Sequence, residues 1–550
     1  MTSQPTDAPT FAALVTARAD DDRTALWFEE RSWTWREVVT EALRRAALVE
    51  TALGGGRRHV ALALENTAEH LFWWLGAGVS GATVVGVNPT RRGAELARDI
   101  TFTGCRMLVV DGARAGILDG VDHGVPDDRV LHVDGPSYAD RLAGVAPATL
   151  ATDPVDPATP LSLIFTSGTT SAPKAVICTQ RRMGRTAEQQ MQRRGLTADD
   201  TFYVAMPMFH SNAIMAGVAP AVCTGATIVL RRRFSASGWL PDVRRYGVTF
   251  FNYVGTPLRY VLATPERPDD ADNPLRIAFG NEATEQDIAE FSRRFGCTVI
   301  DSFGSSEGEI RIMRTADTPP GSLGRAPEGT VVLDPETLEE CPPARFDTEG
   351  RLLNAEQATG EIVNTVGAAL FEGYWDNPEA DAARLRHGWV WSGDLAYRDA
   401  GGFFYFAGRT GDWLRVDGEN VATAPIERLL MRFPAVAGVA VVAVPDEVGD
   451  AVLAVVERAD GCELDPDAFG DFLAEAPDLG TTWAPRWVKI VDALPRTPSN
   501  KVVKRDVDTD LDGRTAGMVF ERVGRTLTYR PRPRAAGGGT PARRRTSRAG

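Results

Sequence analysis

The chain has 550 residues, of which 43% are hydrophobic and 24% charged, and its formal net charge at pH 7 is −14. This length exceeds what one hydrophobic core can organise, so two or more domains are expected in an otherwise ordinary globular composition. The acidic balance argues against general nucleic-acid binding, because a polyanion needs a basic surface.

Six scattered cysteines form no Cys-x-x-Cys pair, which predicts neither a disulfide framework nor a zinc site and fits a reducing cytoplasm. The first ten residues lack the charged-then-apolar pattern of a signal peptide. The most apolar stretch, residues 71–87, is short for a membrane span and is interrupted by glycine, serine and threonine. We therefore predict a buried helix running into a strand there, no stable membrane insertion, and a cytoplasmic protein.

The first 150 residues alternate helix and strand patterns. A helix is predicted over 33–56 and ends at a glycine run, a strand over 59–66, a helix over 68–81, and strands over 83–89 and 106–112. Such alternation is typical of parallel α/β layers. Residues 148–160, rich in proline, aspartate and threonine, read as a linker.

The next stretch, residues 161–176, joins a buried-strand pattern to a loop of small hydroxylated residues that closes with Pro173 and Lys174. Small residues let backbone N–H groups approach an anion, hydroxyls donate further hydrogen bonds, and lysine adds a point charge. The pattern is not that of P-loop nucleotide hydrolases. By composition alone, an ordinary loop and a polyphosphate-binding loop are equally good interpretations.

From residue 176 the α/β pattern continues. Strands are predicted over 201–213, running into a loop that carries His210, and over 225–234, 247–257, 275–284 and 297–309. Residues 320–410 are rich in glycine and proline with short strands, which suggests a small barrel-like section.

The last third predicts a second, smaller α+β domain. Residues 388–421 read as strands joined by glycine-containing turns, and a helix and two strands follow. We place the domains at 1–410 and 411–525. A tail over 526–550 is predicted to be disordered, because residues 530–550 contain seven arginines and no acids.

Lysine is rare in this chain. Of 60 basic residues only Lys174, Lys489, Lys501 and Lys504 are lysines. A lysine that persists in so arginine-rich a chain suggests a need for a compact, rotatable ammonium group.

Five motifs occur in order: TSGTTSAPK (166–174), FGSSEG (303–308), WSGD (391–394), GRTGDWLRVDGENV (408–421) and PRTPSNKVVKRD (495–506). Together they resemble the adenylate-forming superfamily of acyl-CoA synthetases, peptide-synthetase adenylation domains and luciferases. Residues 250–262 and 277–284 are most similar to its actinobacterial fatty-acyl-CoA synthetases. The resemblance implies a large N-terminal domain of layered α/β subdomains with a small β-barrel section, and a small mobile C-terminal α+β domain.

The resemblance also implies an ATP site. The leaving phosphates would be held by Thr166, Ser167, Gly168, Thr169, Thr170 and Lys174, and Mg²⁺ by Glu307 with Thr166. Adenine would stack on Phe303, within a segment that also contributes Ser302, Gly304 and Ser306, and Gly280 and Asn281 would line its other face. Asp394 would accept hydrogen bonds from the ribose hydroxyls, and Arg409 would contact ribose or phosphate.

The implied chemistry is attack of a carboxylate on the α-phosphate of ATP, with Lys501 bridging the two anions and Glu307 and His210 as further catalytic candidates. The small domain would then turn about Gly411 and open a thiol tunnel near Gly418 and Glu419 for coenzyme A.

Each of these residues also has a plain structural interpretation when it is considered alone. Asp394 could be a turn residue, Glu307 a solvated surface acid, Phe303 a core residue and Lys501 an exposed loop lysine. The ordered set of motifs favours function for all of them except His210, for which packing and function remain open.

The acid is expected to be hydrophobic. Peptide-synthetase domains carry Phe-Asp where this chain has Phe209-His210, which argues against an α-amino acid. The expected acyl pocket is apolar and aromatic, and it comprises Phe250, Phe251, Tyr253, Val254 and Gly255.

Two functions remain open: a complete ligase that uses ATP, Mg²⁺ and coenzyme A, and an adenylating enzyme that passes its product to a second ligase or a carrier protein. The retained Lys174, Glu307, Asp394 and Lys501 argue against a non-catalytic nucleotide-binding homologue.

The chain departs from the family pattern in its phosphate loop, before its catalytic lysine and at its hinge. Ser171 and Ala175 replace glycines of the phosphate loop, Asn500 replaces the glycine before Lys501, and Gly411 replaces the charged hinge residue.

Overall fold

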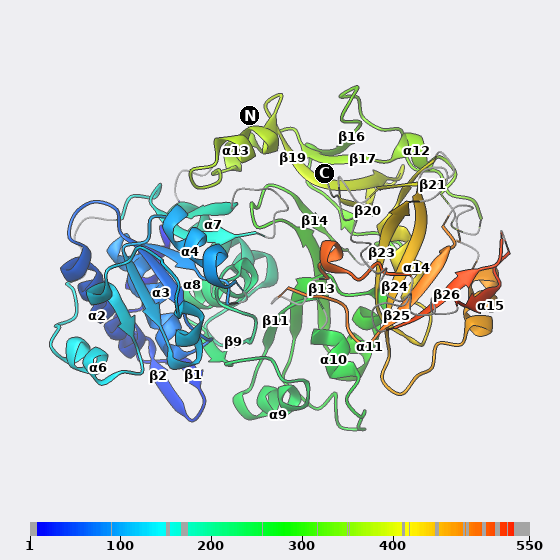
Figure 1. Ribbon diagram of the computed structural model, residues 1–550. Coiled ribbons are helices and arrows are strands. Elements are labelled where there is room, and N and C mark those ends of the chain that lie inside the picture. Colours follow the sequence, from blue (N-terminus) through cyan, green and yellow to red (C-terminus); the bar gives the residue numbers. More distant parts are fainter. Residues whose placement is uncertain are drawn as a thin grey trace, which may run out of the picture. The chain divides into compact units, whose positions relative to one another are not determined.

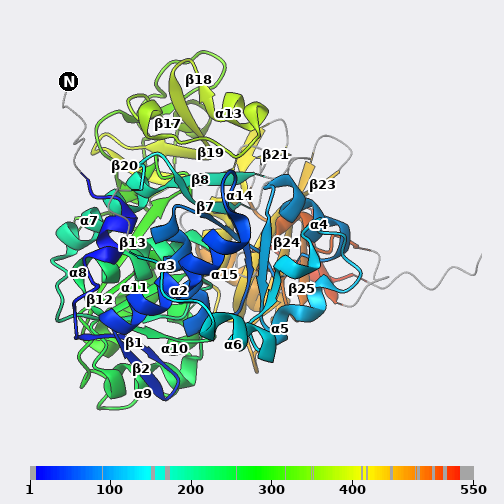
Figure 2. The ribbon, with the colours of Figure 1, turned by 90° about the vertical axis from the view of Figure 1, so that its left-hand side faces the viewer.

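The computed structural model (Figures 1 and 2) describes residues 8–89, 91–149, 155–166, 174–255, 257–315, 317–348, 350, 352–409, 413–416, 419–445, 450–476, 479, 483–497, 502–511, 517–524 and 526–532. It is a mixed α/β protein that divides into two compact units. Unit 1 comprises Met1–Val331, Val363–Ser392 and Thr497–Lys501, and unit 2 comprises Val332–Ile362, Gly393–Arg496 and Val502–Gly550. The boundary predicted at 410/411 stays a prediction.

The first sheet of unit 1 has the order β6-β5-β3-β4-β7-β8. Its strands are β3 (His59–Ala63), β4 (Thr83–Gly86), β5 (Met107–Val110), β6 (Val130–His132), β7 (Pro160–Phe165) and β8 (Ala175–Thr179). Neighbouring strands are parallel except for β7 and β8. The helices of this part are α1 (Phe11–Thr16), α2 (Trp35–Leu53), α3 (Ala68–Ser80), α4 (Gly93–Phe102), α5 (Gly112–Ala115) and α6 (Pro136–Ala143), with 3₁₀ turns η1 (Gly116–Leu118) and η2 (Asp127–Arg129).

The apolar stretch 71–87 is part of α3 and β4, as the sequence predicts. Trp73 and Trp74 of α3 are almost fully buried, and their indole N–H groups donate to Tyr138 Oη at 3.0 Å and Ser162 Oγ at 3.2 Å. Polar partners for both indoles stabilise this helix inside the protein core. Among the described residues, no helix combines the length and apolar character that a membrane crossing would need.

The second sheet of unit 1 has the order β15-β14-β13-β12-β11-β9-β10-β1-β2. Its strands are β1 (Thr24–Phe28), β2 (Arg31–Thr34), β9 (Thr201–Val204), β10 (Thr227–Leu230), β11 (Phe250–Val254), β12 (Ile277–Asn281), β13 (Thr298–Gly304), β14 (Arg311–Met313) and β15 (Gly324–Arg325). The six from β13 to β1 run parallel.

Helices pack on both faces of this second sheet. The helices are α7 (Gln180–Arg194), a π-helical turn η3 (Ala213–Val218), α8 (Ala219–Thr224), α9 (Ala236–Tyr246), α10 (Pro257–Leu262) and α11 (Glu285–Phe295). One core contains Phe250 and Phe279 with residues of α7, η3 and α8, and the other contains Phe251 and Tyr253 with residues of α9, α10 and α11. The rest of unit 1 includes η4 (Ala368–Leu370), α13 (Pro378–Arg384) and β18 (Leu385–Arg386).

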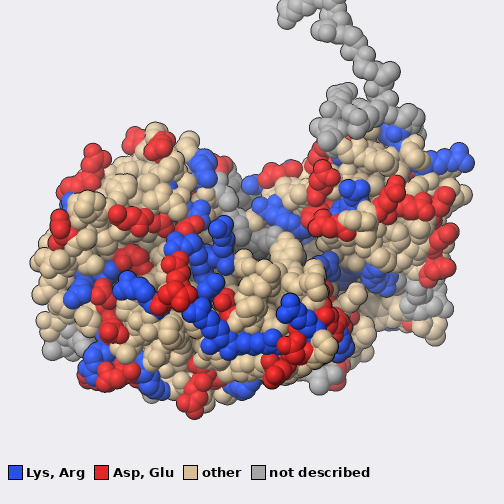
Figure 3. Space-filling model, turned by 90° about the horizontal axis from the view of Figure 1, so that it is seen from below, with Lys and Arg blue, Asp and Glu red and all other residues tan. Residues whose placement is uncertain are grey.

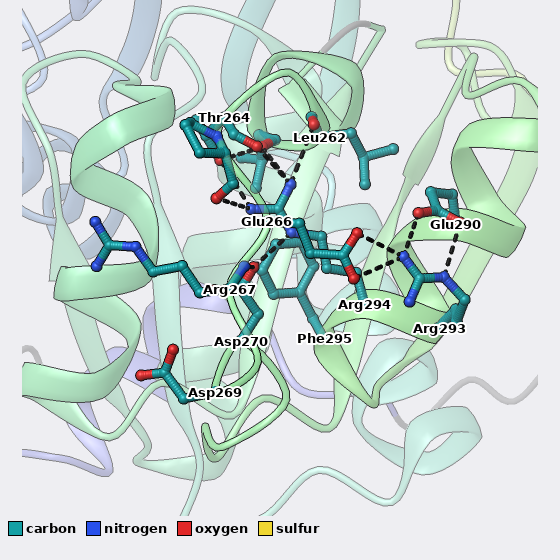
Figure 4. Close-up of polar contacts among 12 residues, drawn as sticks. Leu262, Thr264, Glu266, Arg267, Asp269, Asp270, Glu290, Arg293, Arg294 and Phe295 are labelled. Carbon is teal, nitrogen blue, oxygen red and sulfur yellow. Dashed lines mark hydrogen bonds and ion pairs between the residues drawn. The ribbon is translucent and has the colours of Figure 1, made fainter.

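A buried ion pair lies at the C-terminal end of α10 (Figure 4). Arg294 Nε lies 2.6 Å from Asp270 Oδ2, and both side chains are 3% exposed. The guanidinium group also donates to the carbonyl oxygens of Leu262, Thr264 and Pro265 at 2.8–3.1 Å. Arg294 therefore satisfies backbone groups that the end of a helix leaves without partners.

Unit 2 begins with the strands β16 (Thr330–Leu333), β17 (Gly360–Asn364), β19 (Trp389–Arg398) and β20 (Phe403–Arg409), in the order β16-β17-β19-β20, with α12 (Ala355–Ala358). The first three of these strands cross the boundary between the units. A hairpin follows, made of β21 (Trp413–Val416) and β22 (Glu419–Ala422).

The remaining sheet of unit 2 has the order β23-β24-β25-β26-β27. Its strands are β23 (Val436–Pro445), β24 (Asp450–Arg458), β25 (Trp487–Val491), β26 (Met518–Arg522) and β27 (Tyr529–Pro531), and its helices are α14 (Thr423–Leu430), α15 (Pro466–Glu475) and η5 (Lys504–Asp506).

Strand β27 lies within the segment that the sequence predicts to be disordered. Tyr529 is 1% exposed, packs against Phe469 and donates its hydroxyl to the carbonyl oxygen of Pro485 at 2.8 Å. The buried aromatic ring and the pairing of β27 with β26 correct the start of the predicted tail. Residues 533–550 lie outside the described residues.

Basic and acidic side chains lie interleaved on the face shown in Figure 3. Many of the arginines form surface ion pairs, such as Arg36 with Asp20 and Asp22, and Arg245 with Glu30. All six cysteines are among the described residues, and all have free thiols.

Candidate active site

Several predicted site residues of unit 1 lie at one edge of the second sheet. The loops that carry His210, Gly255 and Glu307 follow the carboxyl ends of the parallel strands β9, β11 and β13, and Asn281 ends β12. In open parallel sheets this edge is where ligands bind.

The phosphate-loop motif spans the turn between β7 and β8. The backbone N–H of Thr166 donates to the carbonyl oxygen of Lys174 at 3.0 Å, directly after the last cross-strand pair, Phe165 and Ala175. This bond closes the neck of the loop. Its tip, residues 167–173 with Ser167, Gly168, Thr169, Thr170 and Ser171, lies outside the described residues.

Tyr374 connects the neck of this loop to Glu307. The segment around Tyr374 pairs with β8, since the N–H of Ile177 donates to Gly373 and the N–H of Trp375 donates to Ala175. This pairing places Lys174 Nζ 5.9 Å from the centre of the Tyr374 ring. The Tyr374 hydroxyl donates to Glu307 Oε1 at 2.6 Å, so two predicted site residues meet through a tyrosine.

Glu307 is buried, and its other oxygen faces a cation. Arg384 Nη2 lies 3.7 Å from Glu307 Oε2 and 3.8 Å from Glu309 Oε2. Burial alone would raise the pKa of Glu307, but Arg384 and the Tyr374 hydroxyl outweigh it and keep the pKa below its ordinary value. For Glu309 the balance is reversed, and burial raises its pKa to about 7. Glu307 is therefore the more fully ionised member of the pair at neutral pH.

A buried, ionised carboxylate fits the predicted Mg²⁺ site, because Mg²⁺ is usually held by one or two carboxylates together with substrate phosphates. The described residues contain no group of three or more His, Cys, Asp or Glu side chains that could hold a metal ion without such a substrate. Glu307 would supply the protein's carboxylate.

The predicted adenine-binding residues connect β12 to β13. Asn281 donates through Nδ2 to the carbonyl oxygen of Ser302 and, at 3.2 Å, to Ser302 Oγ, whose own hydroxyl donates to the carbonyl oxygen of Gly280 at 3.3 Å. A side chain at Gly280 would meet Tyr253 O at 2.3 Å, so close packing requires glycine there. Phe303 is half-buried and Gly304 is exposed at the end of β13.

The loop after β13 is held from two other elements. Arg182 of α7 donates to the carbonyl oxygen of Ser306, and the hydroxyls of Ser306 and Ser211 lie 3.1 Å apart. Gly308 has φ +86°, and a side chain there would lie 2.7 Å from Arg182 Nη2. Arg182 therefore shapes the segment that presents Glu307.

His210 is a half-buried side chain whose imidazole is neutral. Its ring lies 4.4 Å from that of Phe209, and Nε2 is buried without a hydrogen-bond partner in the described structure. Burial lowers the pKa of His210 to about 4. The imidazole is thus uncharged at neutral pH and cannot act there as a cation.

The predicted acyl-pocket residues of β11 do not share one surface. Successive side chains of a strand point to opposite faces. Phe250 packs with Phe202 and Phe279, whereas Phe251 packs with Trp239 on the other face.

Tyr253 lies on the same face as Phe251 and donates its hydroxyl to Asp301 Oδ2 at 2.9 Å. The prediction of a single pocket wall is therefore corrected. Phe250 belongs to the face of α7 and α8, Phe251 and Tyr253 are core residues of the opposite face, and Val254 and Gly255 are half-buried at the strand end.

In unit 2, Asp394 and Arg409 are direct cross-strand partners on β19 and β20. Arg409 Nε lies 3.4 Å from Asp394 Oδ1, and the arginine side chain is 51% exposed. The two residues therefore present a paired carboxylate and guanidinium group. Lys501, Gly411 and Gly418, together with the side chain of Glu419, lie outside the described residues.

The segment after Lys501 is held by Lys489 and Lys504, the two lysines of unit 2. Lys489 is 1% exposed, lies 2.6 Å from Asp508 Oδ2 and donates to the carbonyl oxygen of Asp510 at 2.8 Å. Lys504 Nζ lies 2.9 Å from Glu427 Oε1. Both ammonium groups therefore have structural roles.

The sequence-based prediction missed Tyr374, Arg384 and Arg182. Tyr374 stands in the pattern Gly-Tyr-Trp shortly before Asn377 and Pro378, the cap and first residue of α13, and this helix start was the available local signal. Arg384 and Arg182 carry no local signal, since only the fold brings them to the Glu307 loop.

Comparison with known proteins identifies relatives along almost the whole chain. The family model described as AMP-binding enzyme matches residues 14–375, and that of the AMP-binding enzyme C-terminal domain matches residues 425–501. Steroid-22-oyl-CoA synthetase of Rhodococcus jostii (strain RHA1) is 49% identical over 94% of this chain and 93% of its own length. Medium/long-chain-fatty-acid–CoA ligase FadD17 of Mycobacterium marinum (strain ATCC BAA-535 / M) is 46% identical over 91% of this chain and 96% of its own.

Solved structures show the same fold. ATP-bound MatB from Rhodopseudomonas palustris matches with a TM-score of 0.79 at 24% identity, over 91% of this chain and 98% of that chain. O-succinylbenzoate coenzyme A synthetase (MenE) from Bacillus subtilis, in complex with ATP and magnesium ion, matches with a TM-score of 0.76 at 24% identity, over 91% and 99% of the two chains.

Proposed function

Since the chain belongs to the AMP-binding, adenylate-forming acyl-CoA synthetases, we propose that it joins a large hydrophobic carboxylic acid, a steroid or a long-chain fatty acid, to coenzyme A. The observation that carries this proposal is the full-length similarity to the steroid-22-oyl-CoA synthetase of Rhodococcus jostii. The similarity to FadD17 keeps medium- and long-chain fatty acids in the proposed range.

The first step forms the acyl-adenylate. A carboxylate oxygen of the acid attacks the α-phosphorus of ATP, the bond to the β-phosphate oxygen breaks, and pyrophosphate leaves. We assign to Lys501 the bridging of the two anions, and to Thr166–Thr170 and Lys174 the binding of the leaving phosphates. Mg²⁺, held by Glu307, would neutralise phosphate charge.

The second step transfers the acyl group. The thiol sulfur of coenzyme A attacks the acyl carbonyl carbon, AMP leaves with the bonding electron pair, and the thiol proton is released. Asp394 is assigned to the ribose hydroxyls, Arg409 to ribose or phosphate, and Phe303 to adenine. The ion pair between Asp394 and Arg409 supports a shared role for the first two.

A panel of steroid, fatty and aromatic carboxylic acids, assayed in parallel for pyrophosphate release and acyl-CoA formation, tests this proposal. We expect both products with apolar acids of steroid or long-chain size. Pyrophosphate exchange without acyl-CoA would instead identify an enzyme that only adenylates and hands its product on.

The role of Lys501 is tested by Lys501→Ala. This variant should lose pyrophosphate exchange while still binding ATP, because the lysine acts on the reacting groups and not on the nucleotide as a whole. Unchanged exchange would refute the assignment.

A further inference from the structure

Helix α7 changes character along the face that it turns to the core. Residues 183, 187, 190 and 194 are spaced so that they lie on one side of a helix. Met183 and Ala187 are fully buried, as such a face requires, but the next two positions are Gln190 and Arg194. The last turns of α7 therefore place polar groups where apolar residues are expected.

These polar groups are incompletely satisfied. Gln190 Oε1 and Arg194 Nε are buried and have no hydrogen-bond partner in the described part of the chain. The Arg194 guanidinium carbon lies 3.7 Å from the centre of the Phe279 ring, so the charge is held over an aromatic face of β12. Buried polar atoms without partners are rare and call for an explanation, such as a ligand.

Arg311 of β14 adds a second cation to the same region. It stands directly across from Gly304 of β13, and its Nη1 donates to Gln189 Oε1 of α7 at 3.0 Å. Neither Arg311 nor Arg194 has an acidic partner within 4.0 Å among the described residues, in contrast to Arg294 and Arg384.

The surroundings disfavour both charges. Burial, followed by repulsion from neighbouring arginines including Arg193, lowers the pKa of Arg194 to about 10, and the same causes lower that of Arg311 to about 10. Both remain charged at neutral pH, so the fold carries two half-buried cations whose partial burial costs stability. Such a cost is typical of a binding site that is completed by a ligand.

The position of Arg194 and Arg311 indicates the chemical class of the ligand. Phe279, which lies under Arg194, packs against Phe250 at a ring distance of 6.4 Å, and both belong to the apolar core on the α7 and α8 face. Phe250 is the expected acyl-pocket residue that remains on this face. An apolar molecule bound beside Phe250 would have apolar side chains along most of its length and the two guanidinium groups at one end.

We propose that Arg194 and Arg311, the guanidinium pair, bind an acceptor oxygen of the acid substrate at the end remote from its reacting carboxylate. The oxygen belongs to an oxo group or to a second carboxylate, both of which accept hydrogen bonds from guanidinium groups. This inference rests on the proposed function and narrows its substrate class to apolar acids with a distal polar group.

The test uses matched acids. One pair is a steroid C22 carboxylic acid with and without a 3-oxo group, and the other is a C12 fatty acid with and without a carboxylate at its far end. Acyl-CoA formation is measured for wild type, Arg194→Met, Arg311→Met and the control Arg193→Met. The control removes the same charge from an exposed neighbour on the same helix.

For at least one of the two pairs of acids, we expect the kcat/KM of wild type to be about ten- to a hundredfold higher for the oxygen-bearing acid. This is the range for hydrogen bonds to a charged group. The pair that shows the preference identifies the oxygen. Arg194→Met and Arg311→Met should bring the ratio close to one, while Arg193→Met keeps it.

The melting temperature separates a binding role from a structural one. Both substitutions at the guanidinium pair should leave the melting temperature unchanged or raise it, because each removes a half-buried charge without an acid partner among the described residues. If a methionine variant does not fold, Arg311→Gln is used in its place in the comparison of matched acids. Glutamine keeps a donor toward Gln189.

No preference in wild type for either pair, or a preference that survives both substitutions, would overturn the inference even though the unsubstituted acids are converted to thioesters. Failure to convert any acid of the panel would instead count against the proposed function itself.

Discussion

Replacing Tyr374 by phenylalanine tests whether the tyrosine hydroxyl positions Glu307. The substitution deletes one oxygen, the donor at 2.6 Å from Glu307 Oε1. It retains the ring, which lies 5.5 Å from the ring of Phe371 and 5.9 Å from Lys174 Nζ. The change is therefore confined to a single hydrogen bond to a buried carboxylate.

The size of the effect of Tyr374→Phe follows from the negative charge of the Glu307 carboxylate, which accepts the hydrogen bond. A hydrogen bond to an ionised group contributes about 1.5–3 kcal/mol, which corresponds to about ten- to a hundredfold in an equilibrium or rate ratio. If Glu307 binds Mg²⁺ with the nucleotide, kcat/KM for MgATP should fall by this factor in Tyr374→Phe. The KM for the acid should stay unchanged.

Tyr203→Phe is the matched control. Its hydroxyl also donates to a buried carboxylate, Asp242 Oδ2 at 3.0 Å, on the opposite face of the sheet. Both variants should lose similar stability in urea unfolding, but only Tyr374→Phe should require more Mg²⁺ in pyrophosphate exchange. Identical Mg²⁺ titrations for the two variants would refute the positioning role of Tyr374.

Three further outcomes are expected. Arg294→Met should lower the free energy of unfolding by about 3–5 kcal/mol because it leaves Asp270 buried without its cation; urea unfolding measures this, and a loss below about 1 kcal/mol would contradict the buried pair. His210→Gln should keep the shape of the pH profile of adenylation from about pH 5.5 to 8, because burial lowers the pKa of His210 to about 4 and the imidazole is already neutral there; a lost inflection near pH 6.5 would argue otherwise. Burial raises the pKa of Asp301 from 3.8 to about 7, so the folded state binds this proton more tightly than the unfolded state and stability falls as pH rises through that interval. Asp301→Asn should flatten that part of the stability profile, as followed by thermal unfolding at a series of pH values.

Local patterns predicted the elements well where hydrophobic periodicity and caps agree. Helix α2 begins at the capping box of Thr34 and Glu37, and the apolar run that resembles a short membrane span is a buried helix followed by a strand. The order of the motifs was enough to predict the family, which the comparisons confirm.

Contacts between distant residues could not be predicted in the same way. Tyr374 and Arg384 lie 67 and 77 positions from Glu307, and nothing in their own segments indicates that the fold brings them to its two oxygens. Strand alternation separates Phe250 from Phe251, whereas an apolar and aromatic composition alone groups them in one pocket. The pairing of Asp394 with Arg409 depends on the register of a hairpin with a bulge.

The scarcity of lysine leaves few side chains that amine-directed reagents can label. Two of its four lysines, Lys489 and Lys504, hold their ammonium groups in ion pairs within unit 2. An amine-directed reagent must reach the side-chain nitrogen, so Lys489, which is 1% exposed, is expected to label slowly. A footprint taken by mass spectrometry with and without ATP therefore compares only a few lysine-containing peptides, and protection by ATP is expected at Lys174 and Lys501, the two side chains assigned to the phosphates.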